Sequence, residues 1–511
     1  MRRLVLAAVA VVGCGSGSHP GVSDGSVDAP PADAAPDAPH VPVQTYIKAS
    51  NTGAGDAFGM SVALSGDGKT LAVGAPYEAS NATGIGGDQA NDAASQAGAV
   101  YVYVLDQGTW AQQAYVKASN AQAGDQFGYA LALGDDGNTL AVSALDEQSC
   151  ATGIDGDQQD NACSTSGAVY LFTRSGATWS QQAYVKPSNT TYRNGNVRAF
   201  GQSLALSGDG TTLAVGDPAE ASNATGIDGD QTNTTMTLSG AVFVFVRAGQ
   251  TWSQQAYVKA SNTGGMDELG YSVALSRTGD VMVAGAANEA SAARGVNGSQ
   301  VDNSMTYAGA AYVYTRSGTT WSQRAYLKAS NTDHNDMFGS AVAISASGTT
   351  IAVGAYGEAS NAVGIDGDQT DNSQLDAGAV YVFAGGGSGW AQQAYVKEAT
   401  ASNNNDSFGY AVSLSADGNT LLAGAFEARA VQGQIGAAYG VSRAGSTWSH
   451  RVVYGAASPD ASDLFGFTVS QSADGSAVAI GAPGEDSAAT GVGGNATDDS
   501  AMTAGAAYVV R

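Results

Sequence analysis

The chain has 511 residues, of which 43% are hydrophobic and 13% are charged, so it has enough apolar material for a large core and is not disordered as a whole. Its formal net charge is −25, from 46 acidic and 21 basic residues. A negative field of this size repels phosphate backbones, which argues against nucleic acid as a partner.

The amino-terminal residues have the pattern of an export signal. Arg2 and Arg3 precede an apolar run, residues 4–12, that is too short to span a bilayer, which predicts a signal peptide over residues 1–13. The run ends in Val-Val-Gly-Cys, which resembles the lipobox of bacterial lipoproteins. This resemblance implies cleavage before Cys14 and lipidation of that residue. An ordinary signal peptide that happens to contain a cysteine is the alternative.

A tether follows the expected lipidation site. Residues 15–43 contain six of the eleven prolines and no aromatic residue, so this segment cannot form a core and should be a semi-extended linker. In the lipoprotein interpretation, Gly15 in place of an aspartate implies forwarding to the outer membrane. The sequence therefore predicts an exported protein, displayed at the cell surface, that meets the membrane only through its lipid anchor.

The rest of the chain, residues 44–511, repeats one unit seven times. The copies align on a Phe-Gly pair, or Leu-Gly in one copy, that begins at Phe58, Phe127, Phe200, Leu269, Phe338, Phe408 and Phe465. Each copy contains short segments rich in Val, Tyr and Ala, such as TLAVGA, GAVYVY and WSQQAYVKAS. Such segments between turn residues are typical of strands, and an Asp-Gly pair in five copies favours a tight hairpin between the first two.

Seven four-stranded antiparallel units predict an all-β fold, a seven-bladed β-propeller. The last copy ends at Arg511 without its fourth segment, and the missing piece, VQTYIKAS, stands at residues 43–50 before the first copy. We expect this amino-terminal strand to complete the last blade, because closure removes an open sheet edge.

The repeats, "FG…GAP" followed by "GAVYVY", resemble the FG-GAP repeats of integrin α propellers and their bacterial relatives. The resemblance covers residues 44–511 and implies a binding or adhesion role. In that family, calcium is held in the hairpin between the first two strands by an Asp-x-Asp-x-Asp-Gly series. Here those turns are short, such as LSGDGKT, and one carboxylate cannot supply the six to eight oxygens that calcium takes. The metal sites of the family therefore do not carry over.

A different acidic loop recurs between the second and third segments, with oxygen-bearing side chains at positions one, three and six around a glycine. This spacing is typical of loops that wrap around calcium, which is the only cofactor that the sequence suggests. The alternative is that Asp, Asn and Gly form turns and bond nearby backbone amides. The candidate calcium ligands are Asp155, Asp157 and Asp160, then Asp228, Asp230 and Asn233, then Asp366, Asp368 and Asp371.

Two more acidic positions recur, and both should lie at one end of the propeller. An Asp stands two residues before the Phe in six copies, and a Glu follows the second segment in every copy. We expect them to cap loop amides and to give that end a negative rim. They are Asp56, Asp125, Asp267, Asp336, Asp406 and Asp463, and Glu78, Glu147, Glu220, Glu289, Glu358, Glu427 and Glu485.

Cysteine and tryptophan complete the set of candidate residues. Cys150 and Cys163 flank the loop of copy two, and in an exported chain they predict a disulfide. Six tryptophans open the fourth segments, where regular recurrence favours packing between blades over stacking on sugars.

Signals of an enzyme are weak. The four histidines do not recur, the sequence has no phosphate-binding glycine loop, and its one Gly-x-Ser-x-Gly match, residues 21–25, lies in the proline-rich tether. The sequence favours a non-enzymatic propeller that binds a protein or a glycan. A hydrolase or lyase acting on polysaccharide in the central funnel and a purely structural envelope component are the alternatives.

Overall fold

A computed structural model describes residues 44–190, 200–386, 389–399, 405–429, 435–460 and 462–511. The expected signal peptide (residues 1–13), the lipidation site Cys14 and the tether (residues 15–43) lie outside the described residues. The described residues form 28 strands and no helix, so none of them belongs to a helix that could cross a membrane.

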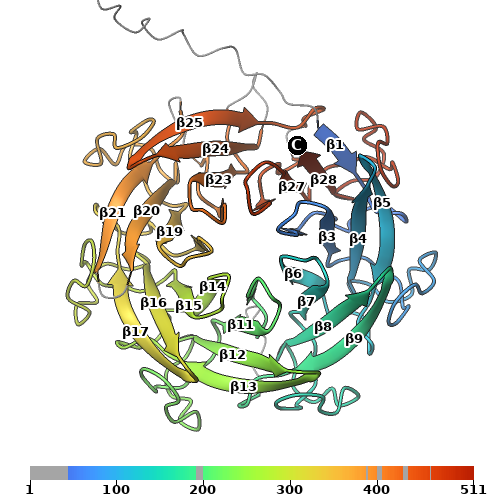
Figure 1. The fold of residues 1–511 in the computed structure, drawn as a ribbon, viewed down its shortest axis with the longest axis horizontal. Helices are drawn as coiled ribbons and strands as arrows, with labels where there is room; N and C mark the ends of the chain where they lie inside the picture. The colour runs from blue at the N-terminus through green and yellow to red at the C-terminus, as the bar shows by residue number, and fades with distance from the viewer. Residues whose placement is uncertain (1–43, 191–199, 387–388, 400–404, 430–434, 461) are drawn as a thin grey trace, which may run out of the picture. The chain divides into compact units, whose positions relative to one another are not determined.

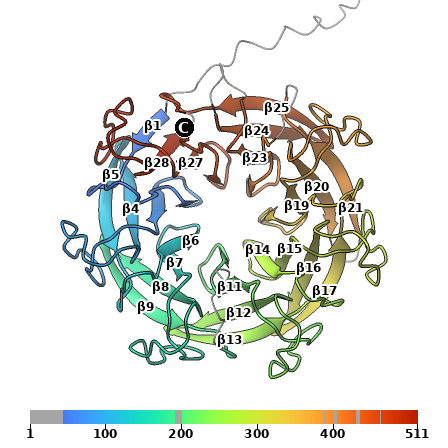
Figure 2. The same ribbon diagram turned by 180° about the vertical axis from the view of Figure 1, so that it is seen from behind.

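The strands form seven four-stranded antiparallel sheets, arranged as the blades of a propeller around one axis (Figures 1 and 2). The predicted fold is therefore confirmed. From the axis outward, blade 1 holds β2 (Ser61–Leu64), β3 (Thr70–Ala75), β4 (Ala99–Asp106) and β5 (Thr109–Val116), and blade 2 holds β6 (Phe127–Leu133), β7 (Thr139–Ala144), β8 (Ala168–Ser175) and β9 (Thr178–Val185). Blade 3 holds β10 (Ser203–Leu206), β11 (Thr212–Asp217), β12 (Ala241–Ala248) and β13 (Thr251–Val258), and blade 4 holds β14 (Leu269–Leu275), β15 (Val281–Ala286), β16 (Ala310–Ser317) and β17 (Thr320–Leu327).

The remaining blades follow the same order. Blade 5 holds β18 (Ala341–Ile344), β19 (Thr350–Ala355), β20 (Ala379–Gly386) and β21 (Gly389–Val396), and blade 6 holds β22 (Ala411–Leu414), β23 (Thr420–Ala425), β24 (Ala437–Ala444) and β25 (Thr447–Tyr454). Blade 7 holds β26 (Thr468–Gln471), β27 (Val478–Ala482), β28 (Ala506–Val510) and, from the other end of the chain, β1 (Gln44–Ile47).

The middle strands are buried on both faces because each blade packs between two neighbours. Every residue of β3 is buried, whereas β5 alternates between exposed and buried positions over its first residues. Seven apolar clusters fill the spaces, and each draws side chains from two adjacent blades.

The Phe-Gly pair anchors each first strand to a neighbouring blade. Phe58 is completely buried and packs edge-on against Tyr101, with ring centroids 5.4 Å apart. Gly59 has φ of +91°, and a Cβ there would overlap the carbonyl oxygen of Ala506 in blade 7. Only glycine allows both the left-handed backbone and this close approach.

The amino-terminal strand closes the ring, as the sequence predicts. β1 pairs antiparallel with β28, with Tyr46 opposite Tyr508 and Gln44 opposite Val510. The two tyrosine rings lie 5.4 Å apart. Blade 7 is thereby built from both ends of the repeat region (Figure 1).

A second closure lies at the axis, at the hairpins between the first and second strands. The backbone N–H of one residue in each hairpin donates to the carbonyl of the corresponding residue in the next blade. The seven bonds are 2.7–3.1 Å long and form an unbroken circle through Gly66, Asp135, Gly208, Arg277, Ala346, Ala416 and Ala473.

Deleting residues 43–50 should destabilise the whole propeller, because the deletion exposes the edge of β28 and removes the covalent link between blades 7 and 1. We expect a lower melting temperature in a scan that follows circular dichroism. A chain that begins at residue 41 is the matched control. An equal melting temperature for the two chains would contradict closure by β1.

Candidate functional site

Each blade has two ends with different chemistry. We call the end of a blade that holds the hairpin between its first and second strands the turn end. We call the opposite end, where the first strand begins and the second strand ends, the entry end. The recurrent Asp and Glu positions lie together at the entry end, where Tyr77 N–H donates to the carbonyl of Asp56. The expected shared end is therefore correct for these two positions.

The expected negative rim is wrong, because six of the seven glutamates and all six aspartates are buried. In six blades the Glu carboxylate forms an ion pair with a Lys that directly follows the outer strand, and no Glu of these pairs is more than 3% exposed. The pairs are Glu78–Lys117, Glu147–Lys186, Glu220–Lys259, Glu289–Lys328, Glu358–Lys397 and Glu485–Lys48, with N–O distances of 2.7–3.0 Å.

Blade 4 shows how the carboxylate is satisfied. Glu289 Oε2 lies 3.0 Å from Lys328 Nζ, and Oε1 accepts hydrogen bonds from the Tyr326 hydroxyl at 2.9 Å and from Asn262 Nδ2 at 3.1 Å. Burial lowers the pKa of Lys328, and Glu289 opposes this shift only in part. Asn262 comes from the connection that enters the blade, so the carboxylate also ties two blades together.

Blade 6 lacks this arrangement altogether. Glu427 is exposed and stands one position too early, because Ala428 N–H bonds to the last residue of the second strand as Glu78 N–H does in blade 1. The prediction of a recurrent Glu in every copy is therefore wrong at Glu427. Gly455 directly follows the outer strand, where the other blades have Lys. Both charges are absent together, which is expected because either one alone would be buried without a partner.

The carboxylates of the recurrent aspartates accept hydrogen bonds from backbone N–H groups. Asp56 Oδ2 accepts a hydrogen bond from Gly53 N–H at 2.8 Å, and four other blades repeat this turn. Burial raises the pKa of these carboxyls, to about 8 at Asp336 and to about 7 at Asp56, Asp125, Asp267 and Asp463. Asp406, the sixth, is also buried.

Replacing Lys328 by Met should lower the free energy of unfolding by about 3–5 kcal/mol, because Glu289 is left buried without its cation. The double variant Lys328→Met, Glu289→Gln should lose less, since the neutral amide still accepts from Tyr326 and Asn262. Urea denaturation of the double-mutant cycle measures both values. The exposed Lys69→Met is the control, and additive single effects would contradict the coupling.

The nine candidate calcium ligands lie in loops at the outer rim, where Ile154 bridges to Val185 on the outer strand (Figure 1). Each accepts a backbone hydrogen bond. Asp155 Oδ1 accepts from Tyr184 N–H at 2.9 Å, Asp157 from Gln159 at 2.9 Å, and Asp160 from Ala162 at 3.0 Å. The other two sets repeat this pattern at Asp228, Asp230, Asn233, Asp366, Asp368 and Asp371. No three His, Cys, Asp or Glu side chains of the described residues gather as metal ligands would.

These bonds favour the turn interpretation, which calcium addition tests. If the carboxylates serve only their own backbone, the melting temperature should be the same in calcium and in a chelator. A rise with calcium that is lost in Asp366→Asn and Asp368→Asn would instead establish cation sites in these loops.

The cysteines and tryptophans have structural positions. Cys150 and Cys163 form a disulfide with Cα atoms 4.9 Å apart. All six tryptophans are buried, at most 8% exposed, so they are not available to sugars. Trp179 Nε1 donates to Gln113 of blade 1 at 3.0 Å, and Arg174 lies over the indole at 5.3 Å.

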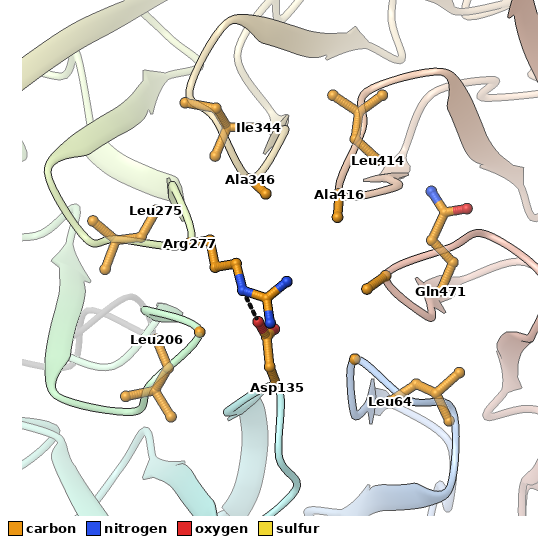
Figure 3. Close-up of a pocket in the computed structure, with 13 residues that line it drawn as sticks. Leu64, Asp135, Leu206, Leu275, Arg277, Ile344, Ala346, Leu414, Ala416 and Gln471 are labelled. Carbon is orange, nitrogen blue, oxygen red and sulfur yellow. Dashed lines mark ion pairs between the residues drawn. The ribbon is translucent and has the colours of Figure 1, made fainter.

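The axis is constricted at the turn end (Figure 3). Aliphatic and small residues enclose a cavity of about 130 Å³, and an ion pair, Asp135–Arg277, crosses it at 2.8 Å. Gly208 lies between the two in the circle, and a Cβ there would overlap both side chains. A space of this size holds about four water molecules. A second hollow at this end, of about 730 Å³, shares Asp135 and Arg277 with it and is also lined by acidic residues of the hairpins, Asp67, Asp136 and Asp209.

At the entry end, four aromatic side chains from three blades gather, and sequence reasoning missed them. Tyr410 packs against Tyr356 at 5.5 Å, Phe426 at 4.7 Å and Phe467 at 5.0 Å between ring centroids. We call these residues the axial aromatic cluster. Comparing the repeat copies at the residue after Phe-Gly and at the residue after the second strand would have indicated it.

Sequence comparison finds FG-GAP repeats at residues 43–103, 110–172 and 321–383. No curated protein matches the chain. Three solved structures are similar in fold. The first is a putative 6-phosphogluconolactonase from Bacteroides uniformis, with 9% identity, a TM-score of 0.43, and 80% of this chain and 95% of that chain covered. The second is the periplasmic gluconolactonase PpgL of Pseudomonas aeruginosa, with 13% identity, a TM-score of 0.46, and 82% of this chain and 97% of that chain covered. The third is the RRP9 WD40 repeats, with 8% identity, a TM-score of 0.48, and 93% of this chain and 99% of that chain covered. The chain is a seven-bladed β-propeller that contains FG-GAP repeats.

Proposed function

We propose that this protein is an exported, lipid-anchored propeller that binds a protein or a glycan of the cell envelope without catalysing a reaction. The observation that carries the proposal is that recurrent side chains are used inside the fold, whereas a non-recurrent group of side chains lies at the entry end of the axis. The recurrent carboxylates are engaged by lysines and backbone amides, whereas the four aromatic side chains of the axial aromatic cluster belong to no set that recurs in every blade. Aromatic rings bind ligands through their faces, and Phe426 and Phe467 have no group that transfers protons.

The anchoring part of the proposal rests on the sequence of residues 1–43. A lipid on Cys14 would hold the chain at the membrane, and the proline-rich segment would leave the propeller free to reach a ligand. The binding surface would lie at the entry end, where the axial aromatic cluster is.

The binding function is tested by sedimentation of the propeller, residues 41–511, with isolated envelope fractions. We expect saturable binding to at least one fraction, before or after protease treatment of that fraction, and no release of reducing sugar. The full chain should partition with membranes, and its Cys14→Ser variant should not. Absence of binding to every fraction, or sugar release that grows with time, would overturn the proposal.

A further inference from the structure

We infer that the axial aromatic cluster, Tyr356, Tyr410, Phe426 and Phe467, is a binding subsite for a neutral glycan. This inference rests on the proposed binding function and names its ligand class. The four rings are contributed by blades 5, 6 and 7 and meet at the entry end of the axis.

The fold does not require aromatic residues at these positions. The residue after the Phe-Gly pair is Met60, Tyr129, Gln202, Tyr271 or Ser340 in the other blades. The residue after the second strand is Pro76, Leu145, Pro218, Ala287 or Pro483 in the other blades. Scaffold positions behave differently, since the Phe or Leu of every Phe-Gly or Leu-Gly pair is completely buried. The position after the Phe-Gly pair is also aromatic in blades 2 and 4, but the position after the second strand is aromatic in blades 5 and 6 alone, so the four-ring contact is local to blades 5 to 7.

The rings are half-buried and set at angles to one another. Tyr410 and Phe426 are inclined by 68°, and Tyr410 and Phe467 by 46°, so the rings are not stacked in parallel. Across the axis, Gln202 Nε2 donates to the Tyr129 hydroxyl at 3.4 Å, while Gln202 Oε1 has no partner among the residues that the structure describes. A few polar groups opposite an aromatic wall are the usual composition of a small-molecule site.

Among ligand classes, a neutral sugar fits this surface best. The C–H face of a pyranose stacks on an aromatic ring, and its hydroxyl groups bond to amides and phenols. The net charge of −25 repels acidic polymers. A stable protein partner needs about 800 Å² on each side, and four rings that already pack against one another offer only part of that area.

Affinity electrophoresis of the propeller, residues 41–511, in gels that contain laminarin, galactomannan, soluble starch or alginate tests the inference. We expect retardation by at least one neutral polysaccharide and none by alginate. Tyr410→Leu and Phe467→Leu, which keep apolar bulk without a ring face, should together weaken binding by about tenfold, and Phe467→Tyr should retain it. Tyr307→Leu, at an exposed tyrosine outside the cluster, is the control.

The outcomes separate the two proposals. Retardation that is lost in the Leu variants at an unchanged melting temperature supports the inference. Retardation that the Leu variants do not change, or retardation by alginate, overturns it. Binding to envelope fractions without retardation by any neutral polysaccharide also overturns it but leaves the proposed function standing, with a protein as the ligand. If the double Leu variant has a lower melting temperature than the unchanged propeller, the single variant Phe467→Leu is tested in its place. The inference then requires that Phe467→Leu weaken binding.

Discussion

Closure of the ring is the constraint on which the rest of this structure depends. Every middle strand is buried by two neighbouring blades, so the burial of each blade requires that the circle be complete. Closure is made in two places. β1 pairs with β28 at the joint between the chain ends, and seven backbone hydrogen bonds join the hairpins around the axis. An open row of blades would leave two apolar faces and a strand edge in water.

Within the closed ring, six of the blades each bury one Lys–Glu ion pair, although the chain has few charged residues. A buried pair costs desolvation of both ions, and it is retained only with good geometry and further hydrogen bonds. Glu289 has both, since Tyr326 and Asn262 donate to it beside Lys328. The asparagine comes from the preceding blade, so the pair fixes how adjacent blades meet. Blade 6 has Ala428 and Gly455 at these two positions and keeps the fold, so a blade can form without the pair.

Repetition therefore separates scaffold from function in this molecule. The side chains that recur, whether Glu, Lys, Asp or Trp, are occupied by ion pairs, backbone amides and packing between blades. The side chains that differ between blades meet at the axis, as the Asp135–Arg277 pair at one end and the axial aromatic cluster at the other. The binding function proposed for the entry end would use positions that differ between blades without disturbing the ring.

The seven blades and their strand pattern could be predicted from the sequence, because the repeat period and the Val- and Tyr-rich segments are visible in it. The closing strand could be predicted because one strand segment is missing from the last copy and present before the first. The disulfide could be predicted because two cysteines flank one loop of an expected exported chain. The sequence did not show that Lys117 neutralises Glu78, because the two lie 39 residues apart and meet only across a folded blade. The sequence also did not show that Glu427 lies one position before the site that Glu78 occupies in blade 1. That register is fixed by the backbone hydrogen bond from Ala428 N–H to the end of the second strand, and spacing alone does not reveal it. Tyr410 and Phe467 belong to different repeats, so only the tertiary structure, by bringing blades 6 and 7 to one axis, decided that their rings are in contact.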